Sequence, residues 1–217
     1  MPIEKHMTYY NILDSFGEKE CPACFLTNKS AHAFFDSFLF ENVLDFDINQ
    51  KLRAARGFCK EHALQLMEFN DGLAVSIIYE TILDDLIKEG SKKILVKKGL
   101  WKESGKCPAC EAHENAEEHY TKAFALYAGD EEFFKKYGES KRLCLPHFRK
   151  VFDKIKDKNI AVKLAELQVE DFSKLKEELK EFIRKSDFKY QKEKWGDEKD
   201  SWIRAIVKLV GSKKGSR

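Results

Sequence analysis

The sequence predicts an all-α protein of two homologous helical repeats, each pinned by a metal-binding group of three cysteines and one histidine, followed by a C-terminal helix. Apolar residues recur at helical spacing along most of the 217 residues. All six cysteines fall inside a pattern that occurs twice. The 4 prolines and 11 glycines are few for the many turns of an all-β fold.

Length, charge and hydropathy exclude several classes of protein. The chain is long enough to bury a core without disulfide bonds. Its 39 Lys+Arg and 37 Asp+Glu give a net charge of +2, which is not the basic footprint of a nucleic-acid-binding domain. Residues 1–20 lack the apolar segment of a signal peptide, and the longest uncharged apolar run, residues 73–79, is far shorter than the ~20 residues of a membrane helix. We therefore expect a cytoplasmic protein with no membrane segment, whose thiols stay reduced.

The cysteine motifs reveal the repeat. Residues 21–24 read Cys-Pro-Ala-Cys, and the same four residues recur 86 positions later at 107–110. Residues 59–62 read Cys-Lys-Glu-His, and residues 144–147, 85 positions later, read Cys-Leu-Pro-His. A steady offset of this kind indicates a duplication. We expect a first metal-binding repeat at 1–90, a basic linker at 91–106, a second metal-binding repeat at 107–190, and a C-terminal helix with a basic tail at 191–217.

Each repeat supplies a complete set of four ligands for a tetrahedral metal ion. Three thiolates and one imidazole suit zinc, with bonds of ~2.3 Å to sulfur and ~2.0–2.1 Å to nitrogen. Two residues separated by two others can face one ion from the first turn of a helix, and Pro22 and Pro108 fit the first helical position. The predicted ligands of two zinc ions per chain are Cys21, Cys24, Cys59 and His62 for the first repeat, and Cys107, Cys110, Cys144 and His147 for the second. Pairing across the repeats is the other arrangement, and it requires a longer-range closure of the chain.

Two alternatives to zinc remain open. Cys-Pro-Ala-Cys resembles the dithiol of redox proteins, although no strand precedes either copy and that interpretation leaves His62 and His147 without a role. An iron–sulfur cluster with three cysteines and one histidine is the main competitor, since Cys-Pro is common beside such clusters. A c-type haem site is excluded, because Phe25 and Glu111 occupy the positions at which its Cys-x2-Cys-His motif requires histidine. The remaining histidines are expected to be ordinary side chains: His6, His32, His113 and His119.

Helical spacing places the remaining elements in order. In the first repeat, helices are expected at residues 31–44, 48–55, 62–69 and 73–89. In the second repeat, they are expected at 111–127, around 148–155 and at 160–185, and a last helix carries Trp202, Ile203, Ile206, Leu209 and Val210. Asp45 or Asp47 caps the second helix and Asp197 the last. Gly90, Gly129 and Gly211 are expected to close helices.

The expected linker is rich in lysine and contains Trp101. Its lysines are Lys92, Lys93, Lys97, Lys98, Lys102 and Lys106, and residues 211–217 form a second basic cluster. A nucleic-acid contact with Trp101 as a stacking platform is one interpretation. We favour a solvated linker and tail, because the near-neutral chain lacks the usual basic footprint.

The combined motifs resemble an uncharacterised bacterial family of unknown function. They are Cys21-Pro22-x-Cys24, Gly57-Phe58-Cys59-x2-His62, Cys107-Pro108-x-Cys110 and Leu143-Cys144-x-Pro146-His147, closed by Asp197-Glu198-x2-Ser201-Trp202-Ile203-Arg204-Ala205. The match covers about residues 9–211. The resemblance implies that the eight ligand positions and residues 202–205 belong to one pattern, and it implies no activity.

The sequence favours a binding protein over an enzyme. Four protein ligands close the coordination shell of a metal, and no Ser-His-Asp order, phosphate-binding loop or H-E-x-x-H motif is present. We expect a binding or scaffold protein with two structural zinc sites and a protein partner of unknown identity. The alternative is a redox protein that uses iron–sulfur clusters or the Cys-Pro-Ala-Cys dithiols, and nucleic-acid binding through the linker is a third, weaker class.

Overall fold

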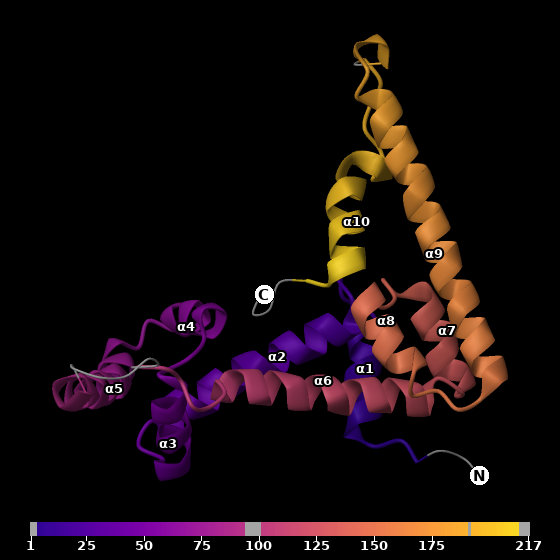
Figure 1. Ribbon diagram of the computed structural model, residues 1–217. Helices are drawn as coiled ribbons and strands as arrows, with labels where there is room; N and C mark the ends of the chain where they lie inside the picture. Colours follow the sequence, from indigo (N-terminus) through magenta and orange to yellow (C-terminus); the bar gives the residue numbers. More distant parts are fainter. Residues whose placement is uncertain (1–3, 94–100, 191, 213–217) are drawn as a thin grey trace. The chain divides into compact units, whose positions relative to one another are not determined.

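The computed structural model describes residues 4–93, 101–190 and 192–212, and this part of the chain is helical with no β-strand (Figure 1). The first half contains α1 (Met7–Ser15), α2 (Pro22–Ser37), the π-helix η1 (Phe38–Asn42), α3 (Phe46–Ala55), α4 (Lys60–Met67) and α5 (Gly72–Lys93). The second half contains α6 (Pro108–Tyr127), α7 (Glu131–Glu139), α8 (Leu145–Phe152), α9 (Lys158–Lys185), the 3-10 helices η2 (Phe188–Tyr190) and η3 (Asp197–Asp200), and α10 (Ser201–Val210). The all-α prediction is confirmed. Within the described ranges, no helix is long and apolar enough to cross a membrane.

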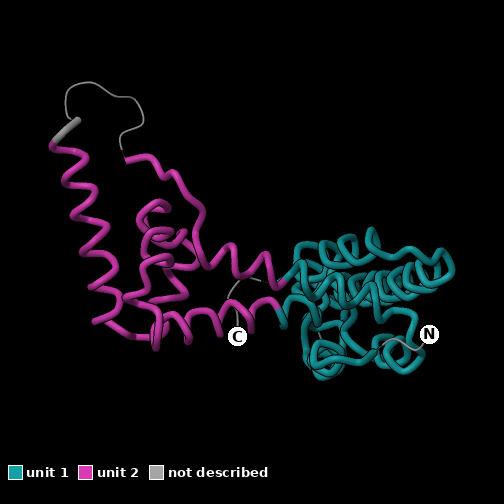
Figure 2. The backbone as a smooth tube through the Cα atoms, turned by 90° about the horizontal axis from the view of Figure 1, so that it is seen from below, with its two compact units in different colours: residues 1–26, 117–213 teal, residues 27–116, 214–217 magenta. Residues whose placement is uncertain are grey.

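The chain forms two compact units that do not follow the two halves of the sequence. Unit 1 contains residues 1–26 and 117–213, and unit 2 contains residues 27–116 and 214–217 (Figure 2). The chain therefore passes from one unit to the other inside α2 and again inside α6. Of the two basic segments expected from the sequence, residues 94–100 of the linker and 213–217 of the tail lie outside the described residues.

The helices recur in the same order along the chain. Their first residues pair as Pro22 with Pro108 (α2, α6), Phe46 with Glu131 (α3, α7), Lys60 with Leu145 (α4, α8), and Gly72 with Lys158 (α5, α9). Each start recurs 85 or 86 residues later, which is also the offset of the cysteine motifs. This is the order that a duplicated helical segment would give.

Each unit has its own aromatic core. In unit 1, the rings of Tyr9 on α1, Phe124 and Tyr127 on α6, and Phe133 and Tyr137 on α7 are fully buried and contact one another. In unit 2, a second cluster gathers Phe35, Phe38, Phe58, Leu52 and Ile78. Burial of such side chains contributes about 1.5–3 kcal/mol each. Each unit therefore has an apolar core in addition to its cysteines and histidine.

Several predicted helix boundaries are corrected by the structure. The helix expected at residues 31–44 begins earlier, at Pro22, and turns into η1 at Phe38. The helices α1 and α7, each of 9 residues, were not predicted. Asp130 signals the start of α7, since its carboxylate accepts the N–H of Phe133 at 3.0 Å.

The predicted caps are confirmed at some positions and wrong at others. Asp45, and not Asp47, caps α3 by accepting the N–H of Ile48 at 2.9 Å. Gly211 ends α10 with a φ of +88°, as expected, whereas Asp197 begins the 3-10 helix η3 in place of capping α10. Gly90 does not close α5, which continues to Lys93.

Gly90 is instead required by the packing of Trp101. A Cβ at residue 90 would lie 3.2 Å from the Trp101 ring, and the indole N–H donates to the carbonyl of Leu86 at 3.0 Å. The Trp101 side chain is therefore attached to α5, with about half of its surface exposed.

Gly105 holds the segment before Cys107 against the end of α3. The backbone N–H groups of Ser104 and Gly105 donate to the carbonyl of Ala54 at 2.9 and 3.1 Å, and a Cβ at residue 105 would lie 2.9 Å from the Cβ of Ala54. We expect Gly105→Ala to lower the free energy of unfolding by about 1–3 kcal/mol, as overpacking does elsewhere. Thermal denaturation checks this, with Gly72→Ala as the control, since nothing lies within 4 Å of that Cβ position. Equal melting temperatures for the two variants would contradict the prediction.

Candidate metal centres

All four cysteine motifs adopt the same local structure at the start of a helix. The first cysteine of each motif precedes α2, α4, α6 or α8, and its carbonyl accepts the first helical hydrogen bond at 2.8–3.1 Å, from Phe25, Ala63, Glu111 or Phe148. The second ligand of each motif, three residues later, lies in the first helical turn. The free N–H groups of a helix start favour a thiolate at these positions. The sequence prediction of helix starts at Pro22 and Pro108 is confirmed.

The first group of ligand atoms, called site A, lies in unit 1. It contains Cys21 and Cys24 at the start of α2, and Cys144 and His147 at the start of α8. The Nδ1 atom of His147 lies 3.6, 3.3 and 3.2 Å from the sulfurs of Cys21, Cys24 and Cys144. The sulfurs of Cys24 and Cys144 are 3.7 Å apart. All four side chains are buried, with 1–6% of their surface exposed.

The second group, called site B, lies in unit 2. It contains Cys59 and His62 at the start of α4, and Cys107 and Cys110 at the start of α6. The Nδ1 atom of His62 lies 3.2, 3.7 and 3.3 Å from the sulfurs of Cys59, Cys107 and Cys110. The sulfurs of Cys59 and Cys110 are 3.6 Å apart. His62 and Cys107 are buried, whereas Cys59 and Cys110 are partly exposed.

The distances in both sites fit a single tetrahedral ion. In each group the four ligand atoms lie within 4.8 Å of one another. Atoms held ~2.0–2.3 Å from one tetrahedral ion are about 3.5–4 Å apart. The measured sulfur–sulfur separations of 3.6 and 3.7 Å therefore match the expectation from the sequence.

The expected pairing of the motifs within each repeat is wrong. The first Cys-x2-Cys motif meets the second Cys-x2-His motif in site A, and the first Cys-x2-His motif meets the second Cys-x2-Cys motif in site B. Each site thus takes one helix start from each predicted repeat. This is the pairing across repeats that the ligand spacing left open.

The charges in both sites require a cation for full ionisation of the thiols. In site A, burial and the neighbouring thiols raise the pKa of Cys21 well above its usual value, whereas hydrogen bonds from Cys144 and Cys21 lower the pKa of Cys24. In site B, burial and the neighbouring thiols of Cys107 and Cys59 raise the pKa of Cys110 to about 12. Three thiolates this close repel one another at neutral pH. A divalent cation would offset two of the three negative charges and displace the remaining protons.

Site A includes a carboxylate behind its histidine. The Nε2 atom of His147 lies 3.1 Å from a carboxylate oxygen of Glu117 on α6, which also contacts Lys150. Burial opposes a charge on His147, but the hydrogen bonds to Cys144, Cys24 and Glu117 outweigh it and raise its pKa to about 11. The His147 contact, followed by Lys150, lowers the pKa of Glu117 to about 2. The Glu117 carboxylate thus lies at ion-pair distance from Nε2, whereas Nδ1 of the same ring faces the three sulfurs.

The turn after α10 covers the other side of site A. The backbone N–H of Ser212 donates to the sulfur of Cys24 at 3.5 Å. A Cβ at Gly211 would lie 3.6 Å from the sulfur of Cys24 and 3.7 Å from that of Cys144, so this glycine lies beside the thiols. Neither the contact of Glu117 with His147 nor that of this turn with the thiols was predicted, because no local sequence signal connects these residues to the cysteines.

We expect Glu117→Gln to weaken zinc binding at site A by about 10–100-fold, because the neutral amide no longer fixes and polarises the His147 ring. A competition titration with a chromophoric zinc chelator measures the two affinities. The matched control is Glu118→Gln, since the adjacent carboxylate contacts only Lys122 and Lys154 among the described ion pairs. Identical affinities for the two variants would show that Glu117 does not support the site.

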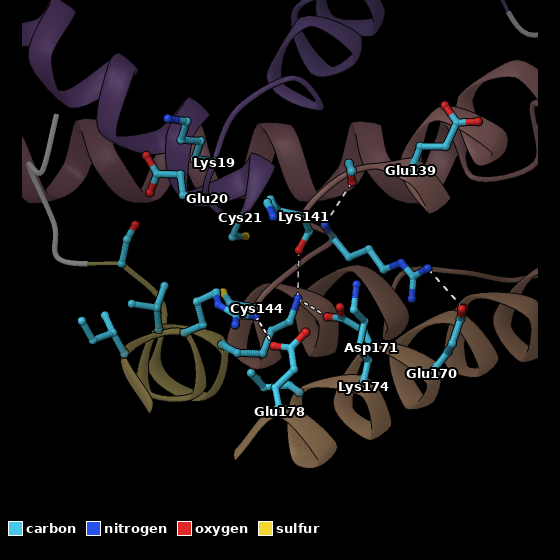
Figure 3. Close-up of a pocket in the computed structure, with 18 of the residues that line it drawn as sticks. Lys19, Glu20, Cys21, Glu139, Lys141, Cys144, Glu170, Asp171, Lys174 and Glu178 are labelled. Carbon is cyan, nitrogen blue, oxygen red and sulfur yellow. Dashed lines mark hydrogen bonds and ion pairs between the residues drawn. The ribbon is translucent and has the colours of Figure 1, made fainter. Parts of the chain in front are cut away.

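A cavity of about 570 Å³ borders site A within unit 1 (Figure 3). Its wall includes Cys21 and Cys144, the segment before α8, and side chains of α9 and α10. Three ion pairs cross the wall: Arg142 with Glu170, Lys208 with Asp171, and Arg204 with Glu178. Because cations and anions alternate, the cavity has no strong preference for a ligand of one charge.

The other histidines lie outside both groups. His32 contacts Asp36 at 2.9 Å, His119 contacts Thr8 at 3.1 Å, and His6 lies 3.7 Å from Glu4. His113 is buried in unit 2, with its ring centre 6.5 Å from that of His62. None of these four belongs to a Cys/His group found among the described residues.

Comparison with known proteins identifies a family and a relative whose functions are unknown. A family described as "Family of unknown function (DUF6062)" matches residues 4–216. The chain is 28% identical over 203 residues to an "Uncharacterized 23.9 kDa protein in xynA 3'region" of Caldicellulosiruptor sp. (strain Rt8B.4), covering 93% of this chain and 100% of that protein. No solved structure matches the chain.

Proposed function

The chain belongs to this family of unknown function (DUF6062), and we propose that it is a zinc-binding helical protein whose sites A and B are both structural. The observation that carries the proposal is the convergence of four ligand atoms within 4.8 Å in each site. In each site the ligands come from two helix starts, so a bound ion would fix the angle between two helices. Four protein ligands leave no open position for water or substrate, which is typical of structural zinc and not of catalytic zinc.

The geometry favours a single zinc ion over an iron–sulfur cluster. A cluster distributes its cysteines over several irons and therefore needs well-separated sulfurs, whereas these ligand atoms surround one point. The dithiol alternative, with Cys21 and Cys107 as the nucleophiles, does not explain why His147 and His62 point Nδ1 at three sulfurs each. Zinc, with its preference for sulfur and imidazole ligands, accounts for all eight side chains.

We also propose a compartment and a role for the protein. The thiols must be reduced to bind zinc, so a reducing compartment such as the cytoplasm suits the protein. We expect a binding or scaffold role with a protein partner, since α10 leaves apolar side chains half to two-thirds exposed: Trp202, Ile206, Leu209 and Val210. Nucleic-acid binding through the basic linker has weaker support, because Trp101 is attached to α5.

Metal analysis of protein purified with and without oxygen tests the proposal. We expect a colourless protein with two zinc ions per chain in both preparations. A brown protein with visible charge-transfer absorption and bound iron after anaerobic purification would contradict zinc and support the redox alternative. A metal-free protein in both preparations would refute the metal sites altogether.

A further inference from the structure

The two sites differ in how far their cysteine residues are exposed. In site A, the exposed fractions of Cys21, Cys24 and Cys144 are 5%, 3% and 1%. In site B, Cys59 and Cys110 are both partly exposed, and their sulfurs are 3.6 Å apart. Site B therefore contains two neighbouring, partly exposed cysteines, one at the start of α4 and one at the start of α6, whereas the cysteines of site A are all buried.

We propose that Cys59 and Cys110 form an oxidation site, at which a peroxide converts the two thiolates to a disulfide and releases the zinc ion of site B. This inference rests on the proposed function, because it takes zinc as the ion that holds these thiolates. It assigns the two sites different roles: site A is a permanent structural centre, and site B is a centre that an oxidant can open.

The chemistry balances with hydrogen peroxide as the oxidant. One exposed thiolate attacks a peroxide oxygen, the O–O bond breaks, and the sulfur becomes a sulfenic acid while hydroxide leaves. The second thiolate attacks the sulfenic sulfur and expels a second hydroxide, which forms the disulfide. Two sulfurs lose two electrons in total, the peroxide gains two, and the two hydroxides take two protons from the buffer acid to form water. With two of its four ligands lost, the zinc ion dissociates.

The geometry of site B allows the disulfide with little movement. The two sulfurs must approach from 3.6 Å to the ~2.05 Å of a disulfide bond. His62 and Cys107 remain buried beneath them. The starts of α4 and α6 stay joined by the new bond, so we expect unit 2 to keep its helices after the metal has left.

Site A is protected by the structure around it. The backbone of Gly211 and Ser212 packs on Cys24 and Cys144. The neighbouring cavity reaches Cys21 and Cys144, yet both remain almost fully buried. The sulfurs of Cys24 and Cys144 are 3.7 Å apart, close to the separation in site B. Exposure, and not the distance between sulfurs, is therefore the feature that separates the two sites.

Stepwise oxidation of the zinc-loaded full chain tests the proposal. Zinc content is measured first, hydrogen peroxide is then added with a chromophoric zinc chelator present, and the disulfides are mapped by mass spectrometry. We expect one zinc ion per chain to be released about tenfold faster than the other, since oxidation follows exposure. The fast phase should coincide with a Cys59–Cys110 disulfide, and dithiothreitol with added zinc should reverse it.

A ligand-conserving variant separates oxidation from simple loss of the metal. Cys110→His keeps four ligand atoms for zinc at site B but removes the second exposed sulfur. We expect this variant to hold two zinc ions and to lose the fast phase of release. Retention of the fast phase would overturn the proposal.

The outcomes distinguish this proposal from the proposed function. A wild-type chain that holds no zinc before peroxide is added would refute the proposed function, and this inference with it. A chain that holds two zinc ions and releases both at the same rate, or releases the ion of site A first, would refute only the oxidation site.

Discussion

Replacing Cys144 with Ser together with His147 with Ala is expected to lower the zinc content from two ions per chain to one. Site A would keep only Cys21 and Cys24, which are too few ligands for a structural ion. Binding of an ion to the folded chain at a thousandfold excess over its dissociation constant stabilises the fold by about 4 kcal/mol. We therefore expect the free energy of unfolding to fall by about this amount, measured by denaturant titration alongside metal analysis.

The control for this variant is His119→Ala, since His119 is exposed and lies outside both metal groups. It should keep two zinc ions and nearly all of its stability. If the Cys144→Ser/His147→Ala protein also keeps two ions and its stability, site A is not a structural metal centre. A loss of both ions would show that site B cannot form without site A.

The largest difference in zinc content is expected between two variants that each remove two complete motifs. In the first variant, Cys21, Cys24 and Cys59 become Ser and His62 becomes Ala, so both motifs of the first repeat are lost. Because these motifs belong to different sites, neither site keeps more than two ligands, and we expect no zinc to be bound. The single replacement Cys59→Ser should by itself remove one zinc ion, that of site B, and lower the melting temperature.

In the second variant, Cys21, Cys24 and Cys144 become Ser and His147 becomes Ala, so all four ligands of site A are lost. Site B keeps its complete set, and we expect one zinc ion per chain. Metal analysis of the two purified proteins distinguishes the pairings, since each variant lacks the same types of residue. The reverse result, with one ion in the first variant and none in the second, would establish pairing within the repeats.

The ligands could be predicted from the sequence, but their pairing could not. The Cys-x2-Cys and Cys-x2-His spacings determine that two ligands share one helix start, and the structure shows this at α2, α4, α6 and α8. The same spacing is compatible with either pairing of the motifs, because every motif places its two ligands at the start of a helix. The packing of helices inside each unit brings two starts together, and no local sequence pattern indicates which two they are.

Chain closure gives little preference for the pairing that is closer in sequence. Cys24 and Cys144 in site A are 120 residues apart, compared with 35 for the Cys24–Cys59 pair that would meet within the first repeat. The closure entropy grows slowly with length, so the longer loop costs only about 1 kcal/mol more. The expectation that a long-range closure disfavours this pairing therefore gave too much weight to a small effect.

The contacts that surrounding residues make with the ligands could not be predicted from the sequence. Glu117 lies on α6, 30 residues before His147, and it contacts the imidazole only because the two helices meet in unit 1. Gly211 was predicted as the end of a helix, which is confirmed. Its contact with Cys24 and Cys144 could not be predicted, since that contact depends on where α10 lies in unit 1.

The central claim, that each metal is held by one motif from each repeat, is tested most directly by cadmium NMR. In protein loaded with the cadmium-113 isotope in place of zinc, each metal signal couples through its bonds to the β-protons of the cysteines that bind it. We predict one cadmium signal coupled to Cys21, Cys24 and Cys144, and a second coupled to Cys59, Cys107 and Cys110. A signal coupled to Cys21, Cys24 and Cys59 would contradict the claim.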